Sequence, residues 1–439
     1  MKNDKKVVIT YGTFDLFHKG HYNILKRAKD LGDYLIVGVT GENYDMERGK
    51  LSVRDSLAKR IENVSETGFA DKIIVEEYLG QKIQDILQYH VDVLVVGSDW
   101  TGKFDHMRKY CEVVYLERTK DISSTQLRET AGDILSLGIV TDDILDDDMV
   151  LESKYVSGVH VEAAYSDNAE LIAEFTEKFE LDQGYTDYDA FLDKVDIVYV
   201  KCRKEKKYGL IKKALERDKI VMSSPITGRN EEEVTTLYQI AAEEKKMLIE
   251  CVPTFYLQAF LQLLWNAKGN LIGDLLYIEN EIRLGSLTGI RKEDLPAHLY
   301  FSILIAMKII GADADFRLNR IEREGGDTFA LLTGQNESGI YISKISDSKK
   351  ASAGLTIRGT KGTIHVPDDW WNIGYFELHD AEQDTVKRYS CNFDGNGLRY
   401  VLVSVLDRVK MQHYTDLRLL KEESVGAIKE IERIMKDEK

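Results

Sequence analysis

Two histidines three residues apart, His18 and His21, have the types and spacing that most directly suggest chemistry in this chain. They close the segment YGTFDLFHKGH, which follows the first short apolar run. Residues three apart share one face of a helix, so in a first helical turn both side chains can point at an anion held by the free N–H groups of that turn. Gly20, between them, lets the backbone approach a phosphate. One histidine at a helix start would indicate only a surface residue or a cap, whereas this pair indicates a phosphate site.

The elements around this segment must position the two histidines. An apolar, β-branched run at residues 6–10 precedes it, an amphipathic helix is expected over residues 21–31 with its end at Gly32, and the strand YLIVGVT follows. Further strands and helices alternate to about residue 130, which indicates an open parallel sheet with helices on both faces. Such sheets bind ligands at the carboxyl ends of their strands, where the histidine segment lies. We expect this first domain to span residues 1–132.

The histidine segment resembles the H-x-G-H signature of the cytidylyltransferase superfamily, and residues 6–129 are similar to the bacterial glycerol-3-phosphate cytidylyltransferases. The similarity includes LKRAKDLGDYLIVGV, VVGSDWTGKFD and VVYLERTKDISST, the last of which looks like a second family signature, R-T-x-x-I-S-T-T. The resemblance implies a Rossmann-like nucleotidyltransferase domain. It also implies transfer from CTP to a small polyol phosphate, with glycerol phosphate as the leading candidate, and release of diphosphate.

The chemistry of this reaction accounts for the same residues. The acceptor phosphate is already anionic, so it can attack the α-phosphorus without a general base, and catalysis reduces to positioning and charge neutralisation. His18 and His21 would donate hydrogen bonds to the α-phosphate, and Arg118 would neutralise the triphosphate or the acceptor. A Mg²⁺ ion held largely by phosphates and water would stabilise the leaving diphosphate. For the segment ISST, an N-cap without a ligand is the plain alternative.

The resemblance also implies a set of nucleotide-binding residues. Arg48 and Lys50 lie in a polar loop where the family has basic residues, although solvated loop charges explain them equally well. Asp99 would accept a hydrogen bond from the cytidine. One departure is Gly68, close to where relatives carry an arginine, so a phosphate contact is missing or moves to Arg60. The implied CTP-binding residues are Gly12, Thr13, Phe14, Gly20, Arg48, Lys50, Asp99, Trp100, Ser123, Ser124 and Thr125.

The remaining two thirds of the chain contain two further α/β domains, expected at residues 133–253 and 254–439. The first again alternates strands and helices, as in a doubly wound Rossmann-type sheet, and places the acidic cluster TDDILDDDM in its first strand-to-helix connection. The second contains long alternating runs typical of a large, mostly antiparallel sheet. Together they resemble the oxidoreductase family typified by glucose-fructose oxidoreductase and inositol dehydrogenase.

The cofactor that this second resemblance implies, NAD(P), is doubtful in this chain. A dinucleotide site needs glycines in the first turn, but Thr141, Asp142 and Asp143 occupy those places, and carboxylates there repel a diphosphate. The family motif E-K-P reads Ser223, Ser224, Pro225, so its lysine ammonium is missing.

Three other acidic or basic residues match positions of that family. Asp294 and His298 fall where it has an aspartate and a histidine on one helix face, and they indicate either a retained polyol-binding site or a buried structural histidine. Asp167 lies where a ribose-binding acid would be, although an ordinary strand-end aspartate is the simpler interpretation.

Composition limits the partners. A net charge of −16 argues against binding to nucleic acid or an anionic membrane, and no apolar stretch suggests a signal peptide or membrane insertion, so we expect a cytoplasmic protein. The 4 cysteines form no C-x-x-C pair and indicate neither a zinc site nor a disulfide. We expect CTP and a small polyol phosphate as ligands and a homodimer as the assembly.

Three functions remain open for the oxidoreductase-like part. It is either a degenerate module that supports dimerisation through its open sheet, or an active NAD(P)-dependent enzyme that makes or modifies the polyol, or a sensor or docking module for a cell-surface polymer pathway.

Overall fold

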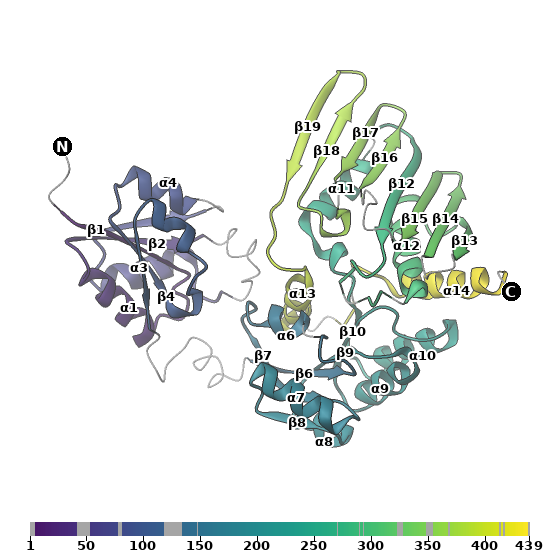
Figure 1. Ribbon diagram of the computed structural model, residues 1–439, viewed down its shortest axis with the longest axis horizontal. Helices are drawn as coiled ribbons and strands as arrows, with labels where there is room; N and C mark the ends of the chain where they lie inside the picture. The colour runs from purple at the N-terminus through teal and green to yellow at the C-terminus, as the bar shows by residue number, and fades with distance from the viewer. Residues whose placement is uncertain are drawn as a thin grey trace. The chain divides into compact units, whose positions relative to one another are not determined.

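The structure, a computed structural model, describes residues 5–41, 53–77, 81–117, 134–146, 148–269, 271–288, 290–292, 294–322, 328–347, 354–367, 369–411, 414–415 and 418–437 (Figure 1). The chain divides into two compact units. The first comprises Met1–Ile134 with Tyr155–Gly158, and the second comprises Leu135–Lys154 with Val159–Lys439.

The first unit is built on a five-stranded parallel sheet in the order β3-β2-β1-β4-β5. Its order changes direction between β1 and β4, and such a switch point is where open sheets of this kind bind ligands. The strands are β1 (Val7–Gly12), β2 (Tyr34–Thr40), β3 (Lys72–Glu76), β4 (Val93–Gly97) and β5 (Glu112–Leu116).

Helices cover both faces of this sheet, because the strand residues that point to one face and those that point to the other are both largely apolar. Val8 packs with Leu25 and Val64 of the helices α1 (Lys19–Lys29) and α3 (Leu57–Glu66). On the opposite face, Ile9 packs in a cluster with Ile86 of α4 and with Met107 of a 3₁₀ turn. The helix α4 spans Gln81–Gln88, and the 3₁₀ turns η1 and η2 span Ser98–Trp100 and Asp105–Lys109.

The second unit begins with a six-stranded parallel sheet in the order β11-β10-β9-β6-β7-β8, the order of a dinucleotide-type Rossmann fold. Its strands are β6 (Leu135–Thr141), β7 (Val159–Tyr165), β8 (Gln183–Tyr185), β9 (Ile197–Lys201), β10 (Ile220–Ser223) and β11 (Leu248–Glu250). Its helices are α6 (Asp148–Ser153), α7 (Ala169–Phe179), α8 (Tyr188–Leu192), α9 (Lys204–Glu216) and α10 (Glu231–Glu243).

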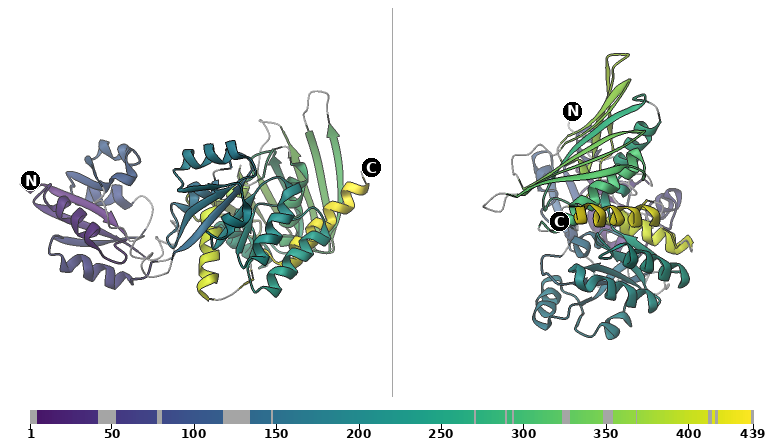
Figure 2. Two further views of the ribbon diagram at one scale, coloured as in Figure 1. Left: turned by 90° about the horizontal axis from the view of Figure 1, so that it is seen from below. Right: turned by 90° about the vertical axis from the view of Figure 1, so that its right-hand side faces the viewer.

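The second unit also contains an eight-stranded sheet in the order β13-β14-β15-β12-β16-β17-β18-β19. Helices α11 (Gln258–Lys268), α12 (Leu295–Ile310) and α14 (Lys421–Asp437) lie on one side of it (Figure 2), and α13 spans Leu398–Met411. The strands are β12 (Leu275–Arg283), β13 (Asp315–Glu322), β14 (Thr328–Asn336), β15 (Gly339–Ser346), β16 (Leu355–Gly359), β17 (Gly362–Val366), β18 (Tyr375–Asp380) and β19 (Thr385–Ser390).

The fold class expected from the sequence is confirmed, with two corrections of detail. The first helix begins and ends two residues earlier than expected, because His18 caps it and Asp30, rather than Gly32, ends it. The large sheet is antiparallel except where β12 and β15 run parallel. The acidic cluster lies between β6 and α6, as expected. None of the described helices is long and apolar enough to cross a lipid bilayer.

Candidate active site

The turn after β1 has an unusual backbone that the rest of the first unit holds in place. Phe14 and Leu16 adopt left-handed conformations, with φ of 54° and 47°, which are costly for residues with a side chain. The ring of Phe14 lies against Gly12, where a Cβ atom would approach it to 3.0 Å. Gly12 therefore serves close packing within the turn, and strained turns of this kind are often found at ligand sites.

Three polar side chains brace this turn from behind. The buried carboxylate of Asp15 accepts hydrogen bonds from the backbone N–H groups of Arg54 and Asp55, each at 2.9 Å. In return, the N–H of Leu16 donates to Asp55 Oδ2 at 3.0 Å. The guanidinium of Arg60, which is 0% exposed, donates to the carbonyl oxygen of Thr13 at 2.9 Å.

Arg60 therefore has a different role from the phosphate contact considered from the sequence. Besides Thr13, it donates to the carbonyl oxygens of Thr40 at 2.6 Å and Asp55 at 3.1 Å. A fully buried guanidinium bonded to backbone carbonyls supports the loop and does not reach a ligand in solvent. Gly68, which lies close to where relatives carry an arginine, follows α3 and has a φ of 70°.

His18 and His21 come together as their spacing predicts. Their rings stack with centroids 4.0 Å apart, and His21 also lies edge-on to Phe14 with a centroid distance of 5.5 Å. His18 is the N-cap of α1, where its Nδ1 accepts a hydrogen bond from the N–H of Gly20 at 3.0 Å. The first turn of α1 has no acidic residue, and three basic residues lie in its last turn. The N-terminus of α1 is thus suited to an anion.

The second group of predicted residues lies across the switch point from the histidines. Asp99 and Trp100 form η1, directly after β4, which pairs with β1. The ring of Trp100 is half-buried and contacts Phe104, with centroids 6.0 Å apart, while the ammonium of Lys103 lies 5.1 Å from the Trp100 ring centroid. Trp100 thus offers an aromatic surface beside the switch point. The side chain of Asp99 lies outside the described part of the chain.

Several of the predicted residues cannot be placed. Arg48, Lys50, Arg118, Ser123, Ser124 and Thr125 all lie outside the described residues. Their proposed contacts with phosphate remain predictions from the sequence.

One cluster that the sequence analysis missed lies at the carboxyl edge of β1, β2 and β3. The ammonium of Lys82 forms an ion pair with the buried carboxylate of Glu76 and lies 4.4 Å from the ring centroid of Tyr11. The hydroxyl of Tyr11 donates to Asp85 at 2.9 Å, and burial together with this carboxylate raises the pKa of Tyr11. The missed signal is that Lys82 and Asp85 share the buried face of α4 with Ile86.

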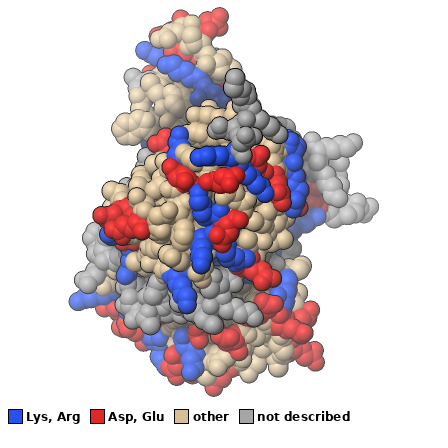
Figure 3. Space-filling view, turned by 90° about the vertical axis from the view of Figure 1, so that its left-hand side faces the viewer, with Lys and Arg blue, Asp and Glu red and all other residues tan. Residues whose placement is uncertain are grey.

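The surface carries charges of both signs. The net charge of the chain is −16, and Lys and Arg side chains are interspersed with Asp and Glu side chains on the face drawn in Figure 3. Among the described residues, no group of three or more His, Cys, Asp or Glu side chains could hold a metal ion.

The candidate residues of the second unit are held in structural roles. His298 is 0% exposed, its Nε2 accepts from the N–H of Gly285 at 3.1 Å, and its Nδ1 lies 2.8 Å from the carbonyl oxygen of Asp294. Burial lowers the pKa of His298. The carboxylate of Asp294 caps α12 by accepting from the N–H of Ala297 at 3.2 Å. This geometry favours the structural interpretation of both residues over a polyol site.

Comparison with known proteins identifies both halves. The family described as cytidylyltransferase-like matches residues 9–130, and the oxidoreductase family with an NAD-binding Rossmann fold matches residues 149–251. The glycerol-3-phosphate cytidylyltransferase of Bacillus spizizenii is 47% identical over 124 residues, which are 28% of this chain and 95% of that protein. The enzyme of the same name from Staphylococcus aureus is 41% identical over 124 residues, 28% of this chain and 93% of that protein.

Solved structures resemble the second unit. A 3-ketoreductase from Actinomadura kijaniata, in complex with NADP and TDP-benzene, has a TM-score of 0.58 at 16% identity and covers 69% of this chain and 97% of its own. An oxidoreductase from Agrobacterium radiobacter has a TM-score of 0.58 at 13% identity, covering 69% of this chain and 95% of its own. At these identities the likeness shows the fold alone. The chain therefore belongs to the cytidylyltransferase-like family, with a nucleotidyltransferase domain of the glycerol-3-phosphate cytidylyltransferase type and, at residues 149–251, a Rossmann domain of the GFO/IDH/MocA oxidoreductase family.

Proposed function

We propose that the N-terminal domain joins CTP to glycerol 3-phosphate, or to a similar polyol phosphate, and produces CDP-glycerol and diphosphate. The observation that carries this proposal is the stacked pair His18 and His21 at the N-terminus of α1, beside the switch point of the sheet. The names of the relatives, glycerol-3-phosphate cytidylyltransferases, support this choice of substrates.

In the proposed reaction a phosphate oxygen of the acceptor attacks the α-phosphorus of CTP. The bond from the α-phosphorus to the oxygen that bridges to the β-phosphate breaks, and diphosphate leaves with its electron pair. The acceptor oxygen carries no proton at neutral pH, so no general base is needed. The task of the protein is to align the two phosphates and to offset the negative charge that builds at the α-phosphate.

His18 and His21 would offset this charge. Because Nδ1 of His18 accepts from Gly20, the neutral ring carries its proton on Nε2, the form that can donate a hydrogen bond to a phosphate oxygen. His21 would donate in the same way from the next position on that helix face. The bracing of the turn by Asp15 and Arg60 would keep both rings in place while the reaction proceeds.

The remaining substrate contacts are also proposals. Asp99 and Trp100 would hold the cytidine, and Arg48, Lys50, Arg118, Ser123, Ser124 and Thr125 would bind the phosphates. Lys82 would bind the acceptor, because its ammonium lies beside Glu76, the last residue of β3, and 4.4 Å from the ring centroid of Tyr11 near the end of β1. The Mg²⁺ ion expected from the sequence would be held largely by the phosphates of CTP and by water, and we assign no step to it.

The test is a diphosphate-release assay with CTP and a panel of phosphorylated alcohols that includes glycerol 3-phosphate, ribitol phosphate, choline phosphate and ethanolamine phosphate. The expected result is turnover with a polyol phosphate and little with the two amino alcohols. Failure with every polyol phosphate would refute the proposed function. ATP, GTP and UTP serve as controls for the base.

For the second unit we propose a degenerate oxidoreductase module that supports a homodimer. The open side of its large sheet offers Tyr277 and Ile340, which are 37% and 47% exposed and lie opposite each other on β12 and β15. Light scattering on the full chain gives the mass directly, and a monomer at micromolar concentration would contradict the proposal. The division into domains at residues 132 and 253 and the cytoplasmic location stay predictions.

A further inference from the structure

The place where a Rossmann sheet of this order holds a dinucleotide is the turn between β6 and α6. A diphosphate is bound there by backbone N–H groups at a helix N-terminus, with glycines that let the backbone approach. Here α6 has 6 residues and begins with Asp148. The one nearby glycine, Gly138, lies inside β6, and a Cβ atom there would meet the ring of Phe191 at 2.4 Å. That glycine serves strand-to-helix packing and not a ligand.

An arginine that is distant in the sequence binds the carboxylates of this turn. The guanidinium of Arg291, in the segment before α12, forms an ion pair with Asp142 and lies 2.8 Å from Asp146 Oδ2. The side chains of both aspartates are only 6% exposed. Burial alone would raise the pKa of Asp142, but the hydrogen bonds from Arg291 and Arg203 hold that pKa below its usual value. Asp142 is thus ionised and partnered.

Two further cations complete this cluster. The ammonium of Lys201, at the end of β9, lies 3.2 Å from Asp146 and 2.8 Å from Asp148. Arg203 donates to Asp142 from its backbone N–H at 2.7 Å and from Nε at 3.1 Å. Among the described residues of this segment, the carboxylates of Asp142, Asp146 and Asp148 therefore face three cations at the switch point between β6 and β9. A dinucleotide would bring two more negative charges to a cluster whose cations already have carboxylate partners, and desolvating them without partners is costly.

Two other residues at positions where the family would contact its cofactor also bind side chains of this chain. Asp167, at the ribose-binding position, forms an ion pair with Lys206. The hydroxyl and carbonyl of Ser224, which replaces the lysine of the E-K-P motif, both accept hydrogen bonds from the buried ammonium of Lys207 at 2.9 Å. At both positions the polar group already has a partner within the chain.

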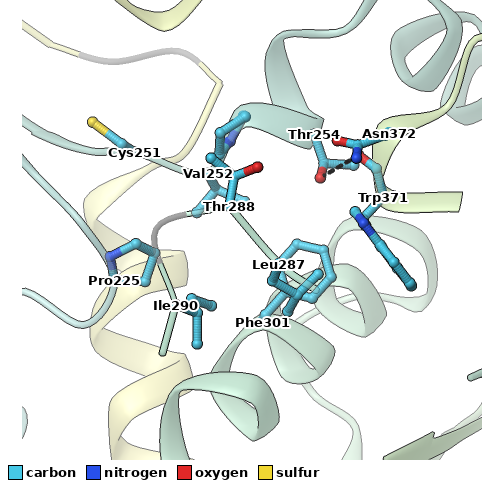
Figure 4. Close-up of a pocket in the computed structure, with 11 residues that line it drawn as sticks. Pro225, Cys251, Val252, Thr254, Leu287, Thr288, Ile290, Phe301, Trp371 and Asn372 are labelled. Atoms are coloured by element: carbon cyan, nitrogen blue, oxygen red, sulfur yellow. Dashed lines mark hydrogen bonds between the residues drawn. The ribbon is translucent and has the colours of Figure 1, made fainter. Parts of the chain in front are cut away.

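A hollow close to this cluster does not replace the lost site. Its volume is about 10 Å³, room for about one water molecule and far below the roughly 300–1,000 Å³ of ordinary ligand pockets. Leu287, Ile290 and Phe301 gather on one side of it and Thr254 and Asn372 on the other (Figure 4). None of its 11 lining residues is charged, so the hollow offers neither a phosphate partner nor a carboxylate or imidazole for proton transfer.

We propose that Arg291 and the carboxylates of the β6–α6 turn form a permanent internal seal, so that the second unit binds neither NAD(H) nor NADP(H) and acts as a rigid support. A second buried ion pair strengthens it: Arg399 of α13 contacts Glu152 of α6 at 2.7 Å and 3.1 Å. Arg291 and Arg399, both from the C-terminal part of the chain, thus form ion pairs with the β6–α6 turn and with α6, the segment that would contact a cofactor in this fold. This inference does not depend on which polyol the first unit uses.

The first test is titration of the full chain with NAD⁺, NADH, NADP⁺ and NADPH, followed by calorimetry and by NADH fluorescence. The expected result is no saturable binding up to millimolar concentrations, from a preparation that still releases diphosphate from CTP. Saturable binding of any of the four at micromolar concentration would overturn the seal. Because cytidylyl transfer is measured separately, its failure would refute only the proposed function.

The second test breaks the seal. Arg291→Met leaves two nearly buried carboxylates without their shared partner, and we expect it to lower the Tm of the second unit by about 5–10 °C. Lys292→Met is the matched control, because it is the next residue in the chain, its side chain is 58% exposed and its ion pair is with Asp347, so its Tm should change by no more than about 2 °C. Arg291→Lys keeps the charge but not the planar guanidinium, so its Tm should lie between those of wild type and Arg291→Met. If Arg291→Met does not fold, the Tm of Arg291→Lys is compared with wild type alone. Equal Tm values for Arg291→Met and wild type would refute the seal.

Discussion

The imidazole rings of His18 and His21 stack with their centroids 4.0 Å apart and their planes at 28°. This arrangement follows from the role of His18 as N-cap, because the bond from Gly20 to its Nδ1 fixes the ring above the first turn of α1, where His21 also lies. Both rings therefore lie at the N-terminus of one helix, whose free N–H groups can bind an anion.

His18→Asn separates capping from catalysis. An asparagine at this position can still accept from the N–H of Gly20, so α1 should keep its start and the Tm should stay within about 2 °C of wild type. Loss of the imidazole donor should lower kcat for diphosphate release roughly 10²–10³-fold. His90→Asn is the control, since His90 is exposed and has a φ of 51°, a conformation that asparagine tolerates. A folded His18→Asn protein with unchanged kcat would remove the proposed mechanism.

Arg60→Met tests whether the turn after β1 must be braced. The substitution leaves the carbonyl oxygens of Thr13, Thr40 and Asp55 without a buried donor and should destabilise the first unit by about 2–4 kcal/mol. Because the turn carries the histidines, kcat should fall and KM for CTP should rise together. Urea unfolding and steady-state kinetics measure these effects. Lys59→Met, an exposed neighbour on α3, should change neither. Normal kinetics in a destabilised Arg60→Met protein would show that the brace serves folding only.

Most of the fold and part of the site could be predicted from the sequence. Contacts between residues that lie far apart in the sequence could not be predicted. The strands and the histidine pair are local patterns, so periodicity and a spacing of three residues were enough. Arg291 and Asp142 are 149 residues apart in the sequence. No local sequence pattern predicts that an arginine before α12 would form an ion pair with a carboxylate of the β6–α6 turn. The partners of His298 illustrate the same limit, because its environment depends on a backbone N–H at Gly285 that only the tertiary structure supplies.

The prediction on Lys82 concerns the acceptor end of the site. Removal of its ammonium should raise KM for glycerol 3-phosphate about 10–100-fold while KM for CTP changes little, because a hydrogen bond to a charged group is lost. Lys82→Met alone would leave Glu76 buried without its partner, so the double variant Glu76→Gln with Lys82→Met is the better protein to measure. Lys72→Met, whose ammonium lies 4.3 Å from the Tyr89 ring centroid, is the control. An unchanged KM for the acceptor in the folded double variant would exclude Lys82 from the site.

The last prediction concerns the pH dependence of the second unit. Burial lowers the pKa of His298 below its ordinary value of 6.5, so the folded state favours the neutral ring more strongly than the unfolded state does. The stability that this neutral ring contributes is therefore fully present above pH 6.5. It is lost as the pH falls from there through the folded pKa, with a slope of at most about 1.4 kcal/mol per pH unit.

His298→Gln should remove this acid sensitivity. A glutamine amide can accept from the N–H of Gly285 and donate to the carbonyl oxygen of Asp294, yet it does not titrate. Unfolding followed by tryptophan fluorescence suits the test, since Trp265, Trp370 and Trp371 all belong to the second unit. The difference in unfolding free energy between wild type and His298→Gln should shrink or reverse between neutral and mildly acidic pH. His160→Gln, with a side chain 38% exposed, should leave the wild-type pH profile in place, and a His298→Gln profile parallel to wild type would show that other groups control the acid response.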